Sequence, residues 1–162
     1  MSNNLIKISF SLNGARVETE VTPQLTVLEM LRRNFRLTAA KEGCGKGECG
    51  ACSIMLNDHP INSCLKLAAT LKPEDRVISV EGFSEDKLMR NIQEAYVEEG
   101  AVQCGFCIPG MTMASYHLLK HNATPDEHAI KQALSGNICR CTGYRKIEAA
   151  VKKAAERTKA NE

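Results

Sequence analysis

The sequence contains no tryptophan, and only 4% of its 162 residues are aromatic. Proteins that bind single-stranded nucleic acid stack bases on aromatic side chains, so this composition argues against that class. The charge gives no reason to propose nucleic acid either, because 21 basic and 19 acidic side chains leave a net charge of only +2. We therefore expect no nucleic-acid partner.

Long apolar runs are also missing. No stretch approaches the roughly 20 apolar residues of a membrane-spanning helix. The opening residues MSNNLIKISF lack the basic segment and apolar run of a secretory signal. We expect no membrane association and a cytoplasmic location, where cysteines serve metal binding or catalysis more often than disulfides.

Cysteine, by contrast, is abundant: the chain has 8 cysteines, and their spacing separates them into two sets. The first set reads C-x4-C-x2-C-x11-C and the second reads C-x2-C-x31-C-x-C. The spacing C-x4-C-x2-C with a distant further cysteine is that of plant-type [2Fe–2S] clusters, which are held by cysteine thiolates. The pattern predicts two [2Fe–2S] clusters as cofactors. The predicted ligands are Cys44, Cys49, Cys52 and Cys64 for the first cluster and Cys104, Cys107, Cys139 and Cys141 for the second.

The first three cysteines lie in the glycine-rich segment GCGKGECGAC at 43–52. A [2Fe–2S] cluster is a bulky anion, and glycines allow backbone N–H groups to approach its sulfurs closely. The alternative is zinc, which usually binds one close cysteine pair and a second close pair; a single loop with three ligands fits that arrangement less well. Cys64 is isolated and could instead be a buried core thiol.

In the second set, each cysteine pair comes just before a predicted helix. Free N–H groups and the positive end of the helix dipole lie at a helix N-terminus. Two such ends that face each other would hold an anionic cluster well. Zinc is a possible alternative for this set taken alone. A dithiol redox pair fits less well, because that motif needs two cysteines near a βαβ pattern.

The residues up to about 82 predict a small α+β domain. Residues 5–12 and 15–21 alternate apolar and polar side chains around Asn13-Gly14, which predicts a β-hairpin. Thr26 and Glu29 form a capping-box pattern before a predicted helix over 26–36. Further strands are expected at 53–56, around 60–61 and at 76–80.

The residues after 82 show helical periodicity instead. Apolar positions predict helices over about 84–98, 109–121 and 125–134, and a last one around 147–154. Helices joined by short links are typical of a compact bundle. We therefore predict two domains, 1–82 with the sheet and 83–162 with the helices.

Three stretches of the sequence resemble one family closely. EGCGKGECGACS, AVQCGFCIPGM and SGNICRCTGY are similar, in the same order, to the signature segments of the iron–sulfur component of the xanthine oxidase family of molybdenum hydroxylases. The resemblance covers roughly residues 5 to 156. It implies a β-grasp, ferredoxin-like first domain and a four-helix-bundle second domain.

The resemblance also implies a role and partners. The chain would be an electron-transfer subunit without catalytic residues of its own, carrying electrons from a large molybdopterin-binding subunit to a flavin (FAD) subunit or another acceptor. The cluster of the helical domain would lie nearer the molybdenum cofactor. Gln103 matches the glutamine that hydrogen-bonds the pterin, and Cys141 matches the ligand whose sulfur approaches the pterin amino group.

One position departs from the family pattern. Many members have threonine where this chain has Ile108, between Cys107 and Pro109. If Pro109 is the first helical residue, Ile108 is the N-cap, a position that isoleucine fills poorly. On that basis the substitution Ile108→Thr should stabilise the fold by about 0.5–1 kcal/mol.

Two other functions remain to be weighed against the electron-transfer subunit. A zinc-stabilised adaptor would use the same two cysteine sets but would be colourless. A free-standing ferredoxin would be a monomer with a mostly polar surface, whereas a subunit should expose apolar patches where its partners dock. The substrate of the complex would be decided by a pocket in another chain.

Overall fold

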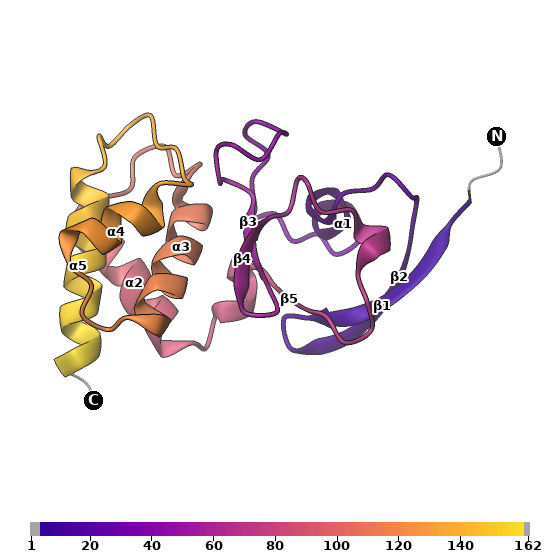
Figure 1. Cartoon of the computed structure of the whole chain (residues 1–162), viewed down its shortest axis with the longest axis horizontal. Coiled ribbons are helices and arrows are strands. Elements are labelled where there is room, and N and C mark those ends of the chain that lie inside the picture. The colour runs from indigo at the N-terminus through magenta and orange to yellow at the C-terminus, as the bar shows by residue number, and fades with distance from the viewer. Residues whose placement is uncertain (1–3, 161–162) are drawn as a thin grey trace.

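The protein, described here by a computed structural model of residues 4–160, has a sheet region followed by a helical region (Figure 1). The sheet region contains one short helix, α1 (Val27–Arg33), and two 3₁₀ turns, η1 (Ala68–Thr70) and η2 (Val80–Phe83). The sheet has five strands in the order β2-β1-β5-β3-β4. These strands are β1 (Ile6–Leu12), β2 (Ala15–Val21), β3 (Ser53–Leu56), β4 (His59–Asn62) and β5 (Arg76–Ile78).

Both hairpins of the sheet turn on two residues with positive φ. Asn13 and Gly14 connect β1 to β2 with φ of 50° and 84°, and Asn57 and Asp58 connect β3 to β4 with 51° and 69°. Positive φ at both central residues is typical of type I′ turns, whose twist matches that of the paired strands. The hairpin predicted at Asn13-Gly14 is confirmed. The sheet is mixed, since β5 pairs parallel with β1 and antiparallel with β3.

Helix α1 packs across the sheet and closes the first hydrophobic core. The Thr26 side chain accepts the Glu29 N–H at 3.2 Å, and the Glu29 carboxylate accepts the Thr26 N–H at 3.1 Å, so the predicted capping box is present. The helix ends before the predicted residue 36, because Arg36 has a φ of 57° that no α-helix accommodates. Its buried face contacts strand residues such as Phe10 and Ile54 in one apolar cluster.

The helical region contains α2 (Lys87–Glu98), α3 (Ile108–His121), α4 (Glu127–Leu134) and α5 (Arg145–Ala160), so each helix predicted after residue 82 has a counterpart. Their buried faces form a second apolar cluster around Tyr96, Met111 and Ile147, which the side chain of Met55 from β3 joins. None of the helices in the range 4–160 is long and apolar enough to cross a membrane.

The start of α3 corrects the expectation about Ile108. The helix begins at Ile108, its N-cap is Cys107, and Pro109 lies within the first turn. Ile108 is therefore not the N-cap, and the predicted stabilisation by Ile108→Thr loses its physical basis. The helix uses a cluster-ligand candidate, not a polar cap residue, at its N-terminus.

The two regions meet where α3 packs against β3 and β4. The contact is closest at the first turn of α3. A Cβ atom on Gly110 would lie 2.1 Å from the Gly50 carbonyl oxygen, far inside van der Waals contact. Glycine in a helix costs about 1 kcal/mol relative to alanine, so its presence here reflects the need for this close backbone contact.

This contact yields a test of the junction. Gly110→Ala should lower the free energy of unfolding by about 1–3 kcal/mol, the usual cost of overpacking, although alanine has the higher helix propensity. Gly136→Ala is the matched control, because a Cβ there meets nothing within 4 Å. Urea denaturation of the three proteins measures the effect. A Gly110→Ala protein as stable as Gly136→Ala would show that the two backbones have room to separate.

Candidate functional site

All eight cysteines lie outside the regular strands, on loops or, for Cys107, at a helix cap. The loop at 43–52 and the loops before α3 and α5 lie on the same side of the molecule, the upper side in Figure 1. None of the eight takes part in a disulfide. Residues far apart in the sequence are thus brought to one region of the surface.

In the first set, backbone N–H groups surround the sulfur of Cys44. The N–H groups of Lys46 and Glu48 donate to it at 3.5 and 3.3 Å. Gly45 and Gly47 have φ of 65° and 80°, and such turns point successive N–H groups at one anion. These hydrogen bonds, led by that of Lys46, lower the pKa of Cys44 to about 6, so the thiolate is the prevailing form at neutral pH.

The other sulfurs of the first set are more enclosed. Cys52 and Cys64 are buried next to each other, and burial, followed by the hydrogen bond with Cys52, raises the pKa of Cys64 to about 11. Cys64 therefore lies beside another candidate ligand, Cys52. This position favours a ligand role for Cys64 over the alternative of an isolated core thiol. The loop is held by Asn62, whose side-chain amide donates to the Gly47 carbonyl at 2.8 Å.

In the second set, the sulfurs come together as two pairs. The sulfurs of Cys104 and Cys141 are 3.5 Å apart and exposed. Cys107 and Cys139 are buried, and burial, followed by the contact with Cys139, raises the pKa of Cys107 to about 12. Cys107 caps α3, as predicted for this set, whereas Cys141 is separated from α5 by a short turn.

The buried sulfur of Cys139 is held by its neighbours. Burial raises its pKa, but hydrogen bonds with Thr142 outweigh this effect, so that the pKa lies below its usual value. The Thr142 hydroxyl is 3.2 Å from the sulfur. The Tyr144 hydroxyl accepts the N–H of Cys139 at 2.9 Å. The backbone and the sulfur of this cysteine are therefore both positioned from the turn before α5.

The donor set fits [2Fe–2S] clusters. Each set supplies two sulfur pairs, and the first set adds backbone N–H groups that compensate the charge of an anionic cluster. The pairs are Cys44 with Cys49, Cys52 with Cys64, Cys104 with Cys141, and Cys107 with Cys139.

The two sets line one cavity. It has a volume of about 270 Å³ and is bordered by Cys44 and Cys49 from the first set and by all four cysteines of the second. Phe106 and Ile138 complete its apolar wall. The sequence predicted the two sets separately, but it contained no signal that they share a cavity.

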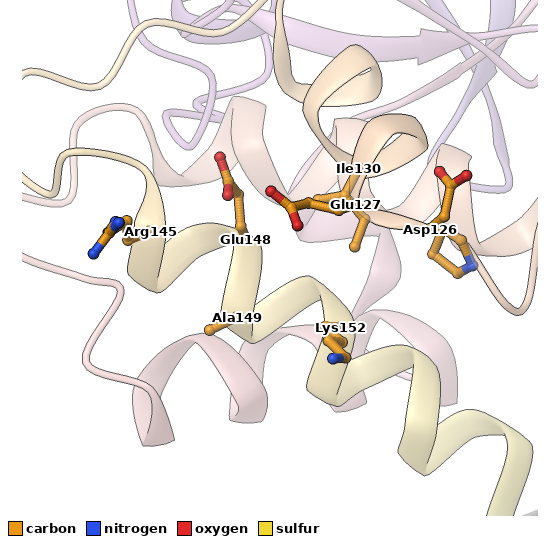
Figure 2. A pocket seen from close by; sticks show the side chains of 8 residues that line it. Asp126, Glu127, Ile130, Arg145, Glu148, Ala149 and Lys152 are labelled. Atoms are coloured by element: carbon orange, nitrogen blue, oxygen red, sulfur yellow. The ribbon is translucent and has the colours of Figure 1, made fainter.

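A second hollow, of about 400 Å³, lies between α4 and α5 and has a different character (Figure 2). Its wall combines the carboxylates of Glu127 and Glu148 with the cations Arg145 and Lys152. Glu127 also forms an ion pair with Lys131 on the next turn of α4. No cysteine lines this hollow, so it is separate from the candidate cluster sites.

Gln103 lies on the exposed loop directly before Cys104. The exposed Cys141 sulfur is next to that of Cys104, so the structure places both residues predicted to face the pterin on one accessible surface. Sequence reasoning missed Asn137, which is buried between the two sets. Its place in SGNICRC, two residues before Cys139, was the available signal.

A glycine in the first loop provides a test of the site. A Cβ on Gly43 would lie 2.8 Å from the sulfur of Cys49. Gly43→Ala should displace that ligand and cost the first cluster, so that iron falls from about four to about two atoms per chain. Iron analysis measures the change, with Gly136→Ala as the control. Full iron content in Gly43→Ala would contradict the placement of Cys49.

The chain matches two families along its length. Residues 10–78 match the family described as a 2Fe-2S iron-sulfur cluster binding domain, and residues 79–152 match the family described as a [2Fe-2S] binding domain. The first region is thus ferredoxin-like, and the second is a helical domain whose family also binds a [2Fe-2S] cluster.

Individual proteins are similar over nearly the whole chain. The nicotinate dehydrogenase small FeS subunit of Eubacterium barkeri is 45% identical and covers 95% of this chain and 98% of its own. The nicotine 6-hydroxylase small subunit of Paenarthrobacter nicotinovorans is 41% identical, covering 90% and 87%. The crystal structure of quinoline 2-oxidoreductase from Pseudomonas putida 86 superposes with a TM-score of 0.89 at 34% identity, covering 98% of each chain. The protein therefore belongs to the small [2Fe–2S] subunits of oxidoreductases of the molybdenum hydroxylase family.

Proposed function

We propose that this chain holds two [2Fe–2S] clusters and carries electrons between them within a larger complex. The observation that supports this most directly is a backbone hydrogen bond between the two cysteine sets. The N–H of Ile138, the residue before Cys139, donates to the carbonyl oxygen of Cys49 at 3.0 Å. Ligand candidates of different clusters are thus connected by a short route of covalent bonds and one hydrogen bond.

Each sulfur pair would hold one iron of its cluster. Cys44 with Cys49 and Cys52 with Cys64 would hold the first cluster, and the remaining two pairs the second. The clusters, when bound, supply one-electron oxidation and reduction. The chain's own residues bring the sulfurs of each set together in pairs, donate N–H groups to Cys44 and keep the two loops in contact.

The surface around the second set supports a docking partner. Cys104 and Cys141 are exposed, and the neighbouring Val102, Phe106 and Ile138 are 41%, 46% and 55% exposed although they are apolar. Exposed apolar patches mark interaction sites. We infer that a large molybdopterin-binding subunit docks here, with Gln103 and Cys141 facing the pterin.

A second partner would dock beside the first set. Leu65 and Leu67 follow Cys64 and are 59% and 41% exposed. We infer that an FAD-binding subunit or another acceptor contacts this side and receives the electrons. Substrate oxidation belongs to the molybdenum subunit, so the isolated chain should turn over no substrate.

Further parts of the predicted architecture belong to the same proposal. The two apolar clusters support a domain division near residue 82, into 1–82 and 83–162. We infer that the first domain is a β-grasp and that α2 to α5, each of which contacts another, form a four-helix bundle. A cytoplasmic location stays a prediction from the use of cysteine as a metal ligand.

The proposal predicts two separable redox centres. The reduced protein should contain about four irons per chain and give two different EPR signals. Cys49→Ser should abolish one signal and Cys139→Ser the other, so that each variant is the control for its counterpart. The assignment is wrong if both substitutions remove the same signal.

The same measurements distinguish the other candidate functions. A colourless protein that contains zinc would establish the adaptor. Two clusters in a chain that purifies from its native host without a large subunit would establish the free-standing ferredoxin. Co-purification with a large and a medium subunit supports the function proposed above.

A further inference from the structure

Asn137 is a buried polar residue between the two cysteine sets, with only 5% of its surface exposed. Its side-chain amide donates a hydrogen bond to the carbonyl oxygen of Gly50 at 3.0 Å. Gly50 lies between Cys49 and Cys52 in the first loop, whereas Asn137 precedes Cys139 by two residues. This side chain therefore connects the loop of one set to the loop of the other.

The Gly50 carbonyl is held from two sides. It accepts the N–H and the hydroxyl of Ser53 at 3.1 and 2.7 Å, in addition to the amide of Asn137. The space around it is full. A Cβ on Gly50 would lie 2.4 Å from Nδ2 of Asn137, and a Cβ on Gly110 would lie 2.7 Å from the same atom. Asn137 therefore packs closely against the backbone of the first loop and the first turn of α3.

The other end of Asn137 is fixed to the second set. Its backbone carbonyl accepts the hydroxyl of Tyr144 at 3.2 Å, and the same hydroxyl accepts the N–H of Cys139 at 2.9 Å. Hydrogen bonds thus link Cys139 through Tyr144 to the backbone of Asn137, and the side chain of Asn137 continues the link to Gly50. It begins beside a ligand candidate of one cluster and ends beside ligand candidates of the other.

The hydrogen bond from Ile138 to Cys49 depends on this anchor. Ile138 is 55% exposed, so little packing of this residue holds its backbone against the first loop. The adjacent Asn137 is bonded to the adjacent Gly50. Two consecutive residues of one segment are therefore paired with two consecutive carbonyls of the other, and the buried pair keeps the exposed pair in register.

We propose that Asn137 is a positioning residue that fixes the separation of the two clusters and maintains the hydrogen bond from Ile138 to Cys49 that connects them. This inference rests on the proposed function, since it requires two clusters in one chain. Asn137 ligates no metal, and its role is to hold the Gly50 carbonyl. Its loss should leave both ligand sets intact and weaken the communication between them.

The experiment uses the full chain with its clusters and compares Asn137→Ala with the parent. Electron exchange between the clusters, followed by EPR after partial reduction, should be slower than in the parent, because the two clusters would no longer be held at a fixed separation. The magnetic splitting between the two reduced clusters should diminish. Iron content should stay at the level of the parent protein.

Asn91→Ala is the matched control. The Asn91 amide also makes two hydrogen bonds inside the protein, to the Ala154 carbonyl and the Thr158 hydroxyl, but it joins α2 to α5 away from the cysteines. It should leave the exchange rate and the splitting unchanged. Asn137→Asp is the second test variant, because it keeps the shape of the side chain and replaces the donor with an acceptor.

Each outcome decides the proposal. Slower exchange and weaker splitting in both Asn137 variants, with full iron content and an unaffected Asn91→Ala, support it. Parental exchange and splitting in either Asn137 variant overturn it, and so does loss of iron in both, since a positioning residue leaves the ligands in place. If the parent protein itself shows a single cluster, the proposed function fails instead, and the iron analysis reveals this before any variant is compared.

Discussion

The close backbone contact between Gly50 and Gly110 determines how the sheet meets the helices. A side chain at either glycine would collide with the other segment or with Asn137. Because the contact lies between Cys49 and Cys52 on one side and just after Cys107 on the other, it also sets how near the two cysteine sets lie. The shared cavity and the backbone hydrogen bond from Ile138 to Cys49 lie beside this contact.

Different groups surround the sulfurs of the two cysteine sets. The first set draws backbone N–H groups towards Cys44 through turns at positive φ, which lowers its pKa. In the second set, burial raises the pKa of Cys107, and the hydroxyl of Thr142 lies near the sulfur of Cys139. N–H groups, hydroxyls and helix ends all stabilise anionic sulfur, and differences in their number and exposure set differences in reduction potential. The surroundings of the two sets therefore differ, as the two sites of a directional electron carrier would require.

Local sequence signals predicted the local structure well. Asn13-Gly14 forms its turn and Thr26 its capping box, because each depends on a few neighbouring residues. The prediction for Ile108 was wrong for the opposite reason. It assumed that Pro109 starts α3, but the helix begins one residue earlier and is capped by Cys107. The path of the preceding loop decides which residue becomes the N-cap. Here that loop carries Cys104 and Cys107, and N-cap propensities do not account for the positions that these cysteines must take.

The sequence by itself determined the chemistry of this protein. Eight cysteines at ferredoxin-like spacing, with glycines among them, identify the candidate metal ligands, since ligand type and loop length follow from covalent order. The tertiary structure decided which sulfurs form pairs, that both sets border one cavity, and that Asn137 lies between them. These relations join residues dozens of positions apart, and they arise from the packing of α3 on β3 and β4, which no local pattern encodes.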